Sequence, residues 1–466
     1  MLEQLNGRWA VGAAELSWVT ASEKNSSHFM VERSIDGRSA FRAVGRVAAH
    51  GSSSSPQAYQ LRDEQASLSA LSSRLYGETE RRGCGGVGNR ARSFACPLFY
   101  PALEPEPRKL PVRFYEIDAL RFLAALSVVF YHYTFCGYAA NTSPIAFPEL
   151  GRITRYGYLG VELFFIISGY VVLLSAQGKT VRQFFISRVT RLYPAFWVAC
   201  TLTFLVKYIW GKGPNDPQMS PYLHVSVRQY GLNLTMLQDF LGVTSIDGAY
   251  WSLAVEITFY FLISLLIGYA LMRHVDWFLA GWLVYTAYAG GHPAPTVFAT
   301  LFFPAYSPYF AAGMLFYLLQ RPEGRTRMRY ALLAIAYLLA VRQGFYRAQE
   351  LTEFFHSDIS RKVAVAAISG FFGMFYLVAF RKINLSRWTW LAVPGALTYP
   401  LYLLHCDIGV IAFHRLNEHV NKYLLVGTTI LLMLVAAHLV HVMLEKRLSK
   451  QLGQWLTKTI PRMLGS

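Results

Sequence analysis

Long apolar stretches alternate with short polar loops from Asp118 to the C-terminal part of the chain. Most of these stretches are about 20 residues long, which is the length that a helix needs to cross the hydrocarbon core of a bilayer. The pattern predicts an all-α integral membrane protein, a bundle of about ten transmembrane helices. The fifth and seventh stretches are short and contain or adjoin Gly and Pro, so nine to eleven spans fit the pattern. The expected spans are 118–138, 156–176, 193–210, 250–272, 276–290, 298–320, 328–343, 362–380, 391–413 and 423–444.

Residues 1–107 have a different composition, rich in Ser, Gly and Arg, with no apolar stretch long enough to cross a bilayer. This composition predicts a disordered N-terminal extension. A basic segment followed by an apolar one, the mark of a secretory signal, is missing, so the first span is expected to direct insertion. The extension also fits a stretch translated upstream of a native start near Leu110 or Val112. The expected organisation is therefore an extension at 1–107, a membrane domain at 113–448 and a cytoplasmic tail at 449–466.

The overall composition excludes a cytosolic enzyme. Of the 466 residues, 54% are hydrophobic and only 15% are charged, whereas soluble domains carry about 25% charged residues. The net charge of +17 arises from Lys and Arg in loops beside apolar stretches and forms no basic face, so we expect no nucleic-acid partner. The five cysteines are scattered without C-x-x-C spacing, and we expect no metal site.

The distribution of basic residues predicts the orientation in the membrane. Lys and Arg gather in every second loop, while the intervening loops hold most of the acids, which is the positive-inside pattern. We therefore expect a multi-pass protein of the cell inner (plasma) membrane with both termini in the cytoplasm. The expected cytoplasmic loops contain Lys179, Arg182, Arg188 and Arg191, then Arg273, then Arg321, Arg325, Arg327 and Arg329, then Arg381, Lys382 and Arg387.

Ionisable residues inside predicted spans are costly and therefore mark candidate functional sites. Arg121 and His132 are eleven residues apart on the first span, which places them on nearly the same helix face, roughly 16 Å apart along the axis. Glu162 and Glu256 are expected at the depth of His132, near the outer surface. For Glu256, a structural role in bracing its helix is an equal alternative.

Further candidates lie near the ends of spans. His405 and Tyr399 belong to the ninth span, where His405 is either a hydrogen-bonded structural residue or part of the site. Arg188 and Arg191 are three residues apart and would share a face of a helix. Such arginines fix topology and bind anionic lipid head groups, and their planar guanidinium groups also suit a phosphorylated ligand.

At these residues the sequence resembles the membrane acyltransferase-3 family, the bacterial integral-membrane O-acyltransferases, over about residues 113–448. The resemblance rests on Asp118-Ala119-Leu120-Arg121 followed by His132, on Gly160 to Tyr170, and on Arg188-Val189-Thr190-Arg191-Leu192-Tyr193-Pro194. It continues in Trp251-Ser252-Leu253 leading to Glu256 and in Tyr399-Pro400-Leu401-Tyr402-Leu403-Leu404-His405. Position 162 is Glu where Asp is also common, and no esterase-like domain follows the tenth span.

The resemblance implies transfer of an acyl group, expected to be acetyl, from cytoplasmic acyl-CoA to a hydroxyl of a carbohydrate or exported glycan. It implies His132 as general base or transient acyl carrier, with Glu162 and Glu256 as further catalytic candidates and Arg121, Arg188 and Arg191 binding the CoA phosphates. Acyl-CoA is then a substrate, and no permanently bound cofactor is expected. A proton-coupled transporter of a small solute is the alternative function, and an interaction scaffold is a third; the acceptor's identity and the oligomeric state stay open.

Overall fold

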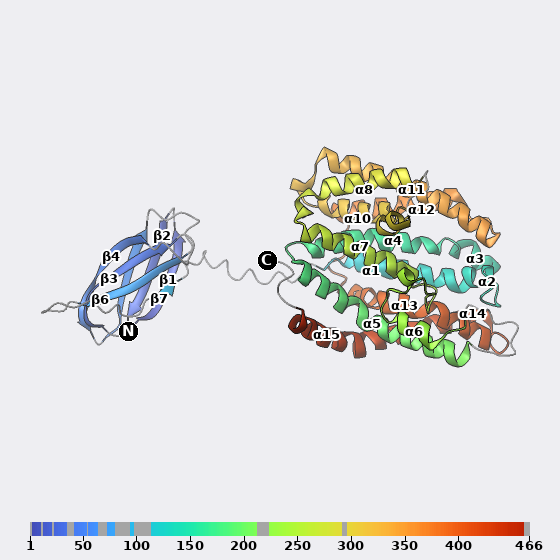
Figure 1. Cartoon of the computed structure of the whole chain (residues 1–466), viewed down its shortest axis with the longest axis horizontal. Helices are drawn as coiled ribbons and strands as arrows, with labels where there is room; N and C mark the ends of the chain where they lie inside the picture. The colour runs from blue at the N-terminus through green and yellow to red at the C-terminus, as the bar shows by residue number, and fades with distance from the viewer. Residues whose placement is uncertain are drawn as a thin grey trace. The chain divides into compact units, whose positions relative to one another are not determined.

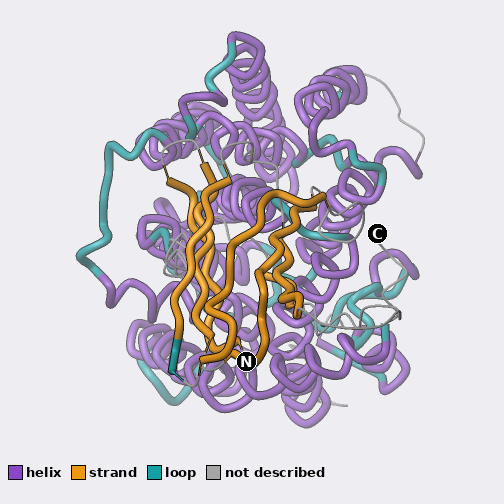
Figure 2. The backbone as a smooth tube through the Cα atoms, turned by 90° about the vertical axis from the view of Figure 1, so that its left-hand side faces the viewer, coloured by secondary structure: helices purple, strands orange, loops and turns teal. Residues whose placement is uncertain are grey.

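The computed structural model divides into two units, Met1–Arg113 and Phe114–Ser466. It describes residues 113–211, 223–290 and 296–460 and, in the first unit, seven strands and residues 55–56. Figure 2 distinguishes the strands of the first unit from the helices of the second. Leu110 and Val112, at the predicted native start, lie outside the described residues.

The first unit differs from the expectation of disorder, because its described segments form two antiparallel sheets. The buried side chains alternate along the strands, as in Leu16, Trp18 and Thr20, so one face packs against a cluster that includes Phe29 and Tyr59. The prediction of disorder rested on the overall Ser, Gly and Arg content, which does not register the alternation of buried residues along a strand. One sheet has the order β1-β2-β5 and the other β4-β3-β6-β7, with β1 Leu2–Ala10, β2 Ala13–Thr20, β3 Glu23–Ser34, β4 Arg42–Ser53, β5 Gln57–Asp63, β6 Ser72–Thr79 and β7 Phe94–Cys96.

The described part of the second unit is helical (Figure 1), which confirms the predicted all-α membrane bundle. Its short helices α2, α3 and α6 lie in connections. In chain order, the α-helices are α1 Tyr115–Tyr131, α2 Gly137–Ala139, α3 Pro148–Thr154, α4 Gly160–Ala176, α5 Val181–Trp210, α6 Val227–Asn233, α7 Trp251–Gly268, α8 Val275–Ala289, α9 Thr296–Phe302, α10 Ser307–Leu319, α11 Arg327–Phe355, α12 Arg361–Ala379, α13 Ala392–Leu416, α14 Lys422–Leu439 and α15 Lys446–Thr459.

Eight helical segments within the described residues are long and apolar enough to cross a membrane. The ten predicted spans all coincide with helices, but the count of ten is not confirmed. Helix α8 has only 15 residues, and the 29-residue α11 carries charges near both ends, at Arg327, Arg329, Glu350 and Glu353. Helix α5 also begins at Val181, well before the predicted start at 193, so Arg188 and Arg191 lie on a continuous helix with Pro194 inside it.

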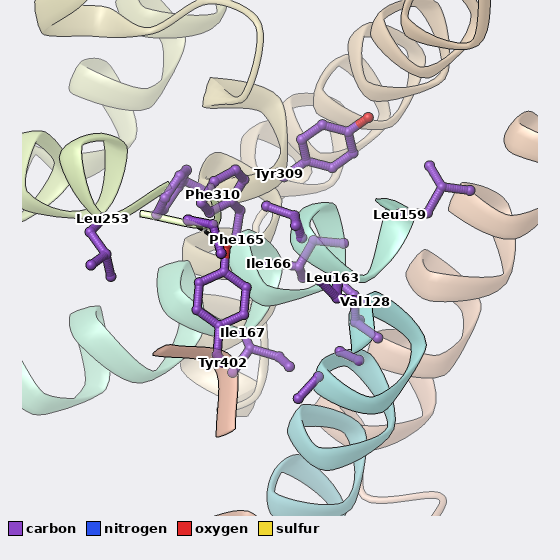
Figure 3. Packing of buried hydrophobic residues seen from close by; sticks show 14 of the residues in the cluster. Val128, Leu159, Leu163, Phe165, Ile166, Ile167, Leu253, Tyr309, Phe310 and Tyr402 are labelled. Carbon is purple, nitrogen blue, oxygen red and sulfur yellow. Dashed lines mark hydrogen bonds between the residues drawn. The ribbon is translucent and has the colours of Figure 1, made fainter. Parts of the chain in front are cut away.

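Helix α4 lies in the middle of the bundle (Figure 1), and 12 of its 17 residues are buried. Two glycines bring α4 against α10: a Cβ at Gly169 would lie 2.1 Å from the Phe310 carbonyl oxygen, and one at Gly313 would lie 2.0 Å from that of Ile166. Close backbone approach through small residues is typical of packing between membrane helices. The rings of Phe165 and Phe310 stack beside this contact with centroids 4.7 Å apart (Figure 3).

The bundle has two chemically different ends. Helix α15, at the end opposite to α2 and α3 in Figure 1, is amphipathic and carries Lys446, Arg447, Lys450 and Lys458. Arg182 at the start of α5 donates to the Ile460 carbonyl oxygen at 3.0 Å and thereby fastens the end of α15 to this side of the bundle. Part of the predicted cytoplasmic tail is thus helical; residues 461–466 lie outside the described residues.

Candidate active site

Two adjoining cavities lie inside the bundle. The arginine cavity has a volume of about 90 Å³ and is lined by α1, α4, α5, α7 and α13. The histidine cavity has a volume of about 560 Å³ and is lined by the end of α1, the start of α4, the residues before and at the start of α7, Tyr306, the end of α11 and Tyr402 of α13. Val161 and Tyr402 belong to both walls, so these side chains form the partition between the cavities.

The His132 imidazole, in the wall of the histidine cavity, is held by a carbonyl group and by a second imidazole. Its Nδ1 lies 3.0 Å from the Val128 carbonyl oxygen and 3.0 Å from Nε2 of His405. The Nδ1 of His405 lies 2.8 Å from the Tyr402 carbonyl oxygen. His405 is fully buried, whereas His132 is only half-buried. The two histidines therefore form a pair in which His132 alone lines the cavity.

These partners define the tautomer of His132. A carbonyl oxygen only accepts hydrogen bonds, so Nδ1 carries the hydrogen in both neutral rings. Nε2 of His405 is then a bare acceptor, and the Nδ1 hydrogen of His132 is shared between it and Val128. The lone pair of His132 Nε2 is left for a substrate in the cavity. This is the form in which histidine acts as a general base.

A local irregularity of α1 positions the pair. The helix ends at Tyr131, and His132–Cys136 form a π-helical turn, which is frequent at functional sites. Within this turn Tyr133 donates its hydroxyl to the His405 carbonyl oxygen at 2.7 Å. Gly409 makes room for the Tyr133 ring, since a Cβ there would lie 2.3 Å from that ring. The same turn thus presents His132 to the cavity and fixes α13 beside it.

The arginine cavity gathers two guanidinium groups and a carboxylate from three helices. Arg121 of α1, Arg191 of α5 and Glu256 of α7 all line it. The Glu256 Oε1 accepts a hydrogen bond from Ser168 at 3.3 Å and another from the Tyr260 hydroxyl. One carboxylate faces two permanent positive charges, so the cavity carries a net positive charge that favours an anionic ligand.

Arg188 and Tyr399 support this cavity in different ways. Arg188 does not line it; its guanidinium carbon lies 5.4 Å from the ring centre of Phe184 and 5.5 Å from that of Tyr260. Stacking of a guanidinium on aromatic rings is a favourable cation–π contact. Tyr399 does line the cavity and donates its hydroxyl to the Leu192 carbonyl oxygen at 3.2 Å. Arg188 therefore holds Tyr260 in place from behind.

Of the three residues predicted to share one depth, His132 and Glu162 line the histidine cavity, whereas Glu256 lines the arginine cavity. Val128 and His405 hold the His132 imidazole, and the Oε2 of Glu162 has no hydrogen-bond partner in the part of the chain that the structure describes.

Helix α11 contributes residues to the histidine cavity that the sequence reasoning missed. Arg347, Glu350, Leu351, Phe354 and Phe355 all line it. Their charges were used only to assign this segment to the outer side of the membrane. A charge shortly after a predicted span was the available signal, but nothing in the spacing shows that the end of α11 lines the same cavity as the start of α4.

A buried ionic cluster anchors the loop before α7, and the sequence reasoning missed it too. The Lys207 Nζ lies 2.6 Å from Asp407 Oδ2 and 2.8 Å from the Ile246 carbonyl oxygen. Asp247 accepts hydrogen bonds from the backbone N–H groups of Ala249 and Asp407. Burial, and next the Asp407 carboxylate, raise the pKa of Asp247 to about 8. Opposite charges inside two predicted spans, at Lys207 and Asp407, were the signal for this pair.

The cluster holds the wall of the histidine cavity in place. The Gly248 N–H donates to Asp407 Oδ1 at 3.4 Å, and Gly248 and Ala249 line that cavity. Asp407 is two residues beyond His405 on α13. The Sγ of Cys406 and oxygens of Asp247 and Asp407 also lie within 4.8 Å of one another, but the ammonium group of Lys207 supplies the positive charge beside these carboxylates.

Residues 114–443 match the family model whose description is "Acyltransferase domain", of the acyltransferase-3 family. The chain belongs to this family. It is therefore an integral-membrane acyltransferase, as the sequence resemblance implied. No solved structure matches the acyltransferase.

Known relatives of the acyltransferase carry related names. It is 25% identical over 311 residues to the putative acetyltransferase ORF330 of Acidianus two-tailed virus, covering 65% of this chain and 83% of the viral one. It is 27% identical over 158 residues to the peptidoglycan O-acetyltransferase OatA of Listeria monocytogenes, covering 32% of this chain and 23% of OatA. It is 29% identical over 167 residues to nodulation protein 10 of Rhizobium leguminosarum, covering 33% of this chain and 44% of that protein.

Proposed function

We propose that this membrane acyltransferase transfers an acyl group, expected to be acetyl, from cytoplasmic acyl-CoA to a hydroxyl group of a carbohydrate or cell-surface glycan. The observation that carries the proposal is the placement of His132. Its Nδ1 is committed to Val128 and His405, and its ring faces a cavity that adjoins the positively charged arginine cavity. Donor and acceptor thus have separate places on the two sides of the partition at Val161 and Tyr402, and the candidate base lies in the acceptor's cavity.

The donor is assigned to the arginine cavity because acyl-CoA is a phosphorylated anion. Arg121 and Arg191 offer planar, permanently charged groups of the kind that bind phosphate in a bidentate way. The residues of α4 in the cavity wall run from Val161 to Val172, which corresponds to roughly 16 Å along the helix. This length matches an extended pantetheine arm that carries the thioester toward the partition at Tyr402, and the cavity of about 90 Å³ has to widen to admit the arm.

The acceptor is assigned to the histidine cavity, and the names of two relatives favour a glycan there. The Listeria protein is a peptidoglycan O-acetyltransferase, and a putative one of Bacillus subtilis is 26% identical over 170 residues. These matches cover about a quarter of each relative, 23% and 24%, so we take only the acceptor class from them. Family membership also favours an acyltransferase over the alternative of a proton-coupled transporter.

In the proposed reaction, Nε2 of His132 accepts the proton of the acceptor hydroxyl while the hydroxyl oxygen attacks the thioester carbonyl carbon. The new C–O bond forms, the C–S bond breaks, and the imidazolium gives its proton to the leaving CoA thiolate. The products are the O-acyl ester and free CoA, and the imidazole returns to its starting form. Throughout the reaction, Nε2 of His405 accepts the hydrogen bond from the Nδ1–H group of His132.

The proposed orientation places the arginine cavity on the cytoplasmic side of the inner membrane, with both termini cytoplasmic. The basic loops and α15 support this orientation through the positive-inside rule. Arg121 and Arg191 then lie on the side of the membrane where acyl-CoA is present.

Two measurements test the proposal. Acetyl-CoA should raise the melting temperature of the purified protein in detergent more than an equal concentration of ATP does, because only the former carries the pantetheine arm. Deletion of the gene in the host should remove an O-acyl ester from a surface glycan. Unchanged glycan acylation, or stabilisation by a transported solute and not by acetyl-CoA, would contradict it.

A further inference from the structure

Two buried polar groups in the histidine cavity lack hydrogen-bond partners among the described residues. They are the Tyr158 hydroxyl and Glu162 Oε2, whose side chains belong to residues that are 7% and 4% exposed. Leaving a buried polar group without a hydrogen bond is unfavourable, so this pair points to a ligand. Tyr158 lies in the 3₁₀ turn Gly157–Leu159 directly before α4 and Glu162 is the third residue of α4, and both line the histidine cavity.

Arg347 of α11 adds a donor to these groups. It lines the same cavity and forms an ion pair with Glu350, with 3.1 Å between Nη1 and Oε2. The two side chains are 42% and 64% exposed, and an exposed pair of this kind contributes little free energy. The guanidinium group is therefore able to turn toward a ligand at small cost. It also lies within electrostatic range of Glu162.

The walls of the cavity suit a sugar ring in shape and surface. The rings of Trp251 and Tyr306 line it with centroids 5.4 Å apart and planes inclined by 34°. Such aromatic faces pack against the C–H groups of a pyranose. The volume of about 560 Å³ lies within the range of about 300–1,000 Å³ typical of small-molecule sites.

The charges of the cavity select among sugars. The charged side chains in its wall are Arg347, Glu162 and Glu350, one positive and two negative. A carboxylate or phosphate on the acceptor would meet both glutamates, whereas neutral hydroxyl groups donate to Glu162 and accept from Tyr158 and Arg347. We infer that Tyr158, Glu162 and Arg347 form an acceptor subsite that binds an uncharged sugar unit through neighbouring hydroxyl groups. This inference rests on the proposed function, which supplies the acceptor class.

The subsite is tested by sugar binding to the full-length protein in nanodiscs without any donor. Saturation-transfer NMR compares neutral trisaccharides of glucose, mannose and N-acetylglucosamine with a trisaccharide of galacturonate. We expect at least one neutral trisaccharide to bind and the galacturonate to bind more weakly. Tyr158→Phe and Arg347→Gln should each weaken binding of the neutral sugar about tenfold, the effect of losing one hydrogen bond of about 1.4 kcal/mol.

Arg152→Gln is the matched control, because Arg152 forms the same kind of exposed pair with Glu149 three residues away but does not line the cavity. Its binding should equal that of the wild type. Unchanged binding in Tyr158→Phe and Arg347→Gln, binding of no neutral sugar, or tighter binding of the galacturonate would overturn the subsite. Acyl transfer separates the two proposals: transfer with an unaltered acceptor KM in both variants leaves the function and removes the subsite. If the variants weaken binding of the neutral sugar but the wild type transfers no acetyl group from acetyl-CoA, the subsite stands and the proposed function is contradicted.

Discussion

Nε2 of His405 lies 3.0 Å from Nδ1 of His132, although the two residues are 273 positions apart in the chain. The contact joins α13 to the π-helical turn after α1, and the carbonyl groups of Val128 and Tyr402 determine which nitrogen carries the hydrogen. His405 thus occupies the place that a carboxylate holds behind the catalytic histidine of serine proteases. We assign it as a positioning residue.

His405→Phe should reduce kcat by about tenfold or more while leaving the KM for acyl-CoA nearly unchanged. The ring keeps its volume but no longer accepts the Nδ1 hydrogen, so the His132 imidazole keeps only its hydrogen bond to the Val128 carbonyl oxygen. Loss of one hydrogen bond of about 1.4 kcal/mol corresponds to about tenfold. His405→Gln keeps an acceptor in this position and should restore part of the activity. The matched control is His414→Gln on the same helix, which bonds to the Thr142 carbonyl oxygen and should stay active.

The ¹⁵N spectrum of histidine-labelled protein separates positioning from mere packing. The His132 signals, identified by comparison with a His132→Gln sample, should show protonated Nδ1 and unprotonated Nε2 in the wild type. An unprotonated Nδ1 in the wild type would contradict the assigned tautomer, as would full activity of His405→Phe.

Arg191→Ala should raise the KM for acyl-CoA about tenfold or more with a smaller effect on the acceptor KM. Hydrogen bonds to charged groups contribute about 1.5–3 kcal/mol, and this contact stabilises the ground state and the transition state alike. Arg191→Lys should rescue only in part, because an ammonium group does not reproduce the bidentate fork. Lys450→Ala is the control for bulk charge, because Lys450 is an exposed cation on α15. Its KM for acyl-CoA should equal that of the wild type.

Arg188→Ala should act differently from Arg191→Ala, since Arg188 stacks on Phe184 and Tyr260 and does not line the cavity. We expect a lower melting temperature and a smaller change in the KM for acyl-CoA. Equal KM effects of the two variants would contradict this division of roles.

Asp247 predicts a pH dependence of stability. Its raised pKa of about 8 means that the folded state keeps a proton that the unfolded state releases near pH 3.9. Stability from this group is therefore present at low pH and falls as pH rises from about 4 to about 8. The melting temperature of Asp247→Asn relative to the wild type should rise across this window, as measured by thermal unfolding in detergent. Parallel profiles of melting temperature against pH for the wild type and Asp247→Asn would contradict the raised pKa of Asp247. Asp358→Asn, which changes an exposed acid, is the control.

The orientation is tested with a matched pair of exposed glutamates, Glu323 in the turn before α11 and Glu353 in the last turn of α11. In a cysteine-free background, a membrane-impermeant thiol reagent should label Glu353→Cys in intact cells and Glu323→Cys only after lysis. The reverse result would put the arginine cavity on the side without acyl-CoA.

The sequence was sufficient for features that lie on one helix or follow from length and polarity. The eleven-residue spacing of Arg121 and His132 placed them on one face, and they line two adjoining cavities. Contacts between distant helices were not accessible in this way: neither the approach of α11 to Glu162 nor the pairing of His405 with His132 is encoded in a local spacing. That Glu256 lines the arginine cavity and not the histidine cavity likewise depends on how α7 packs against other helices.

The central claim is that His132 is the base of an acyl transfer reaction, and replacing it tests this claim most directly. His132→Ala should insert into the membrane, retain the melting temperature shift with acetyl-CoA and lose acyl transfer to the glycan by about 10²–10⁴-fold, the usual contribution of general base catalysis. O-acetylation is measured as ester formed from radiolabelled acetyl-CoA on the host's own glycan in membrane preparations. O-acetylation within about twofold of the wild type, at equal protein amount, would contradict the account.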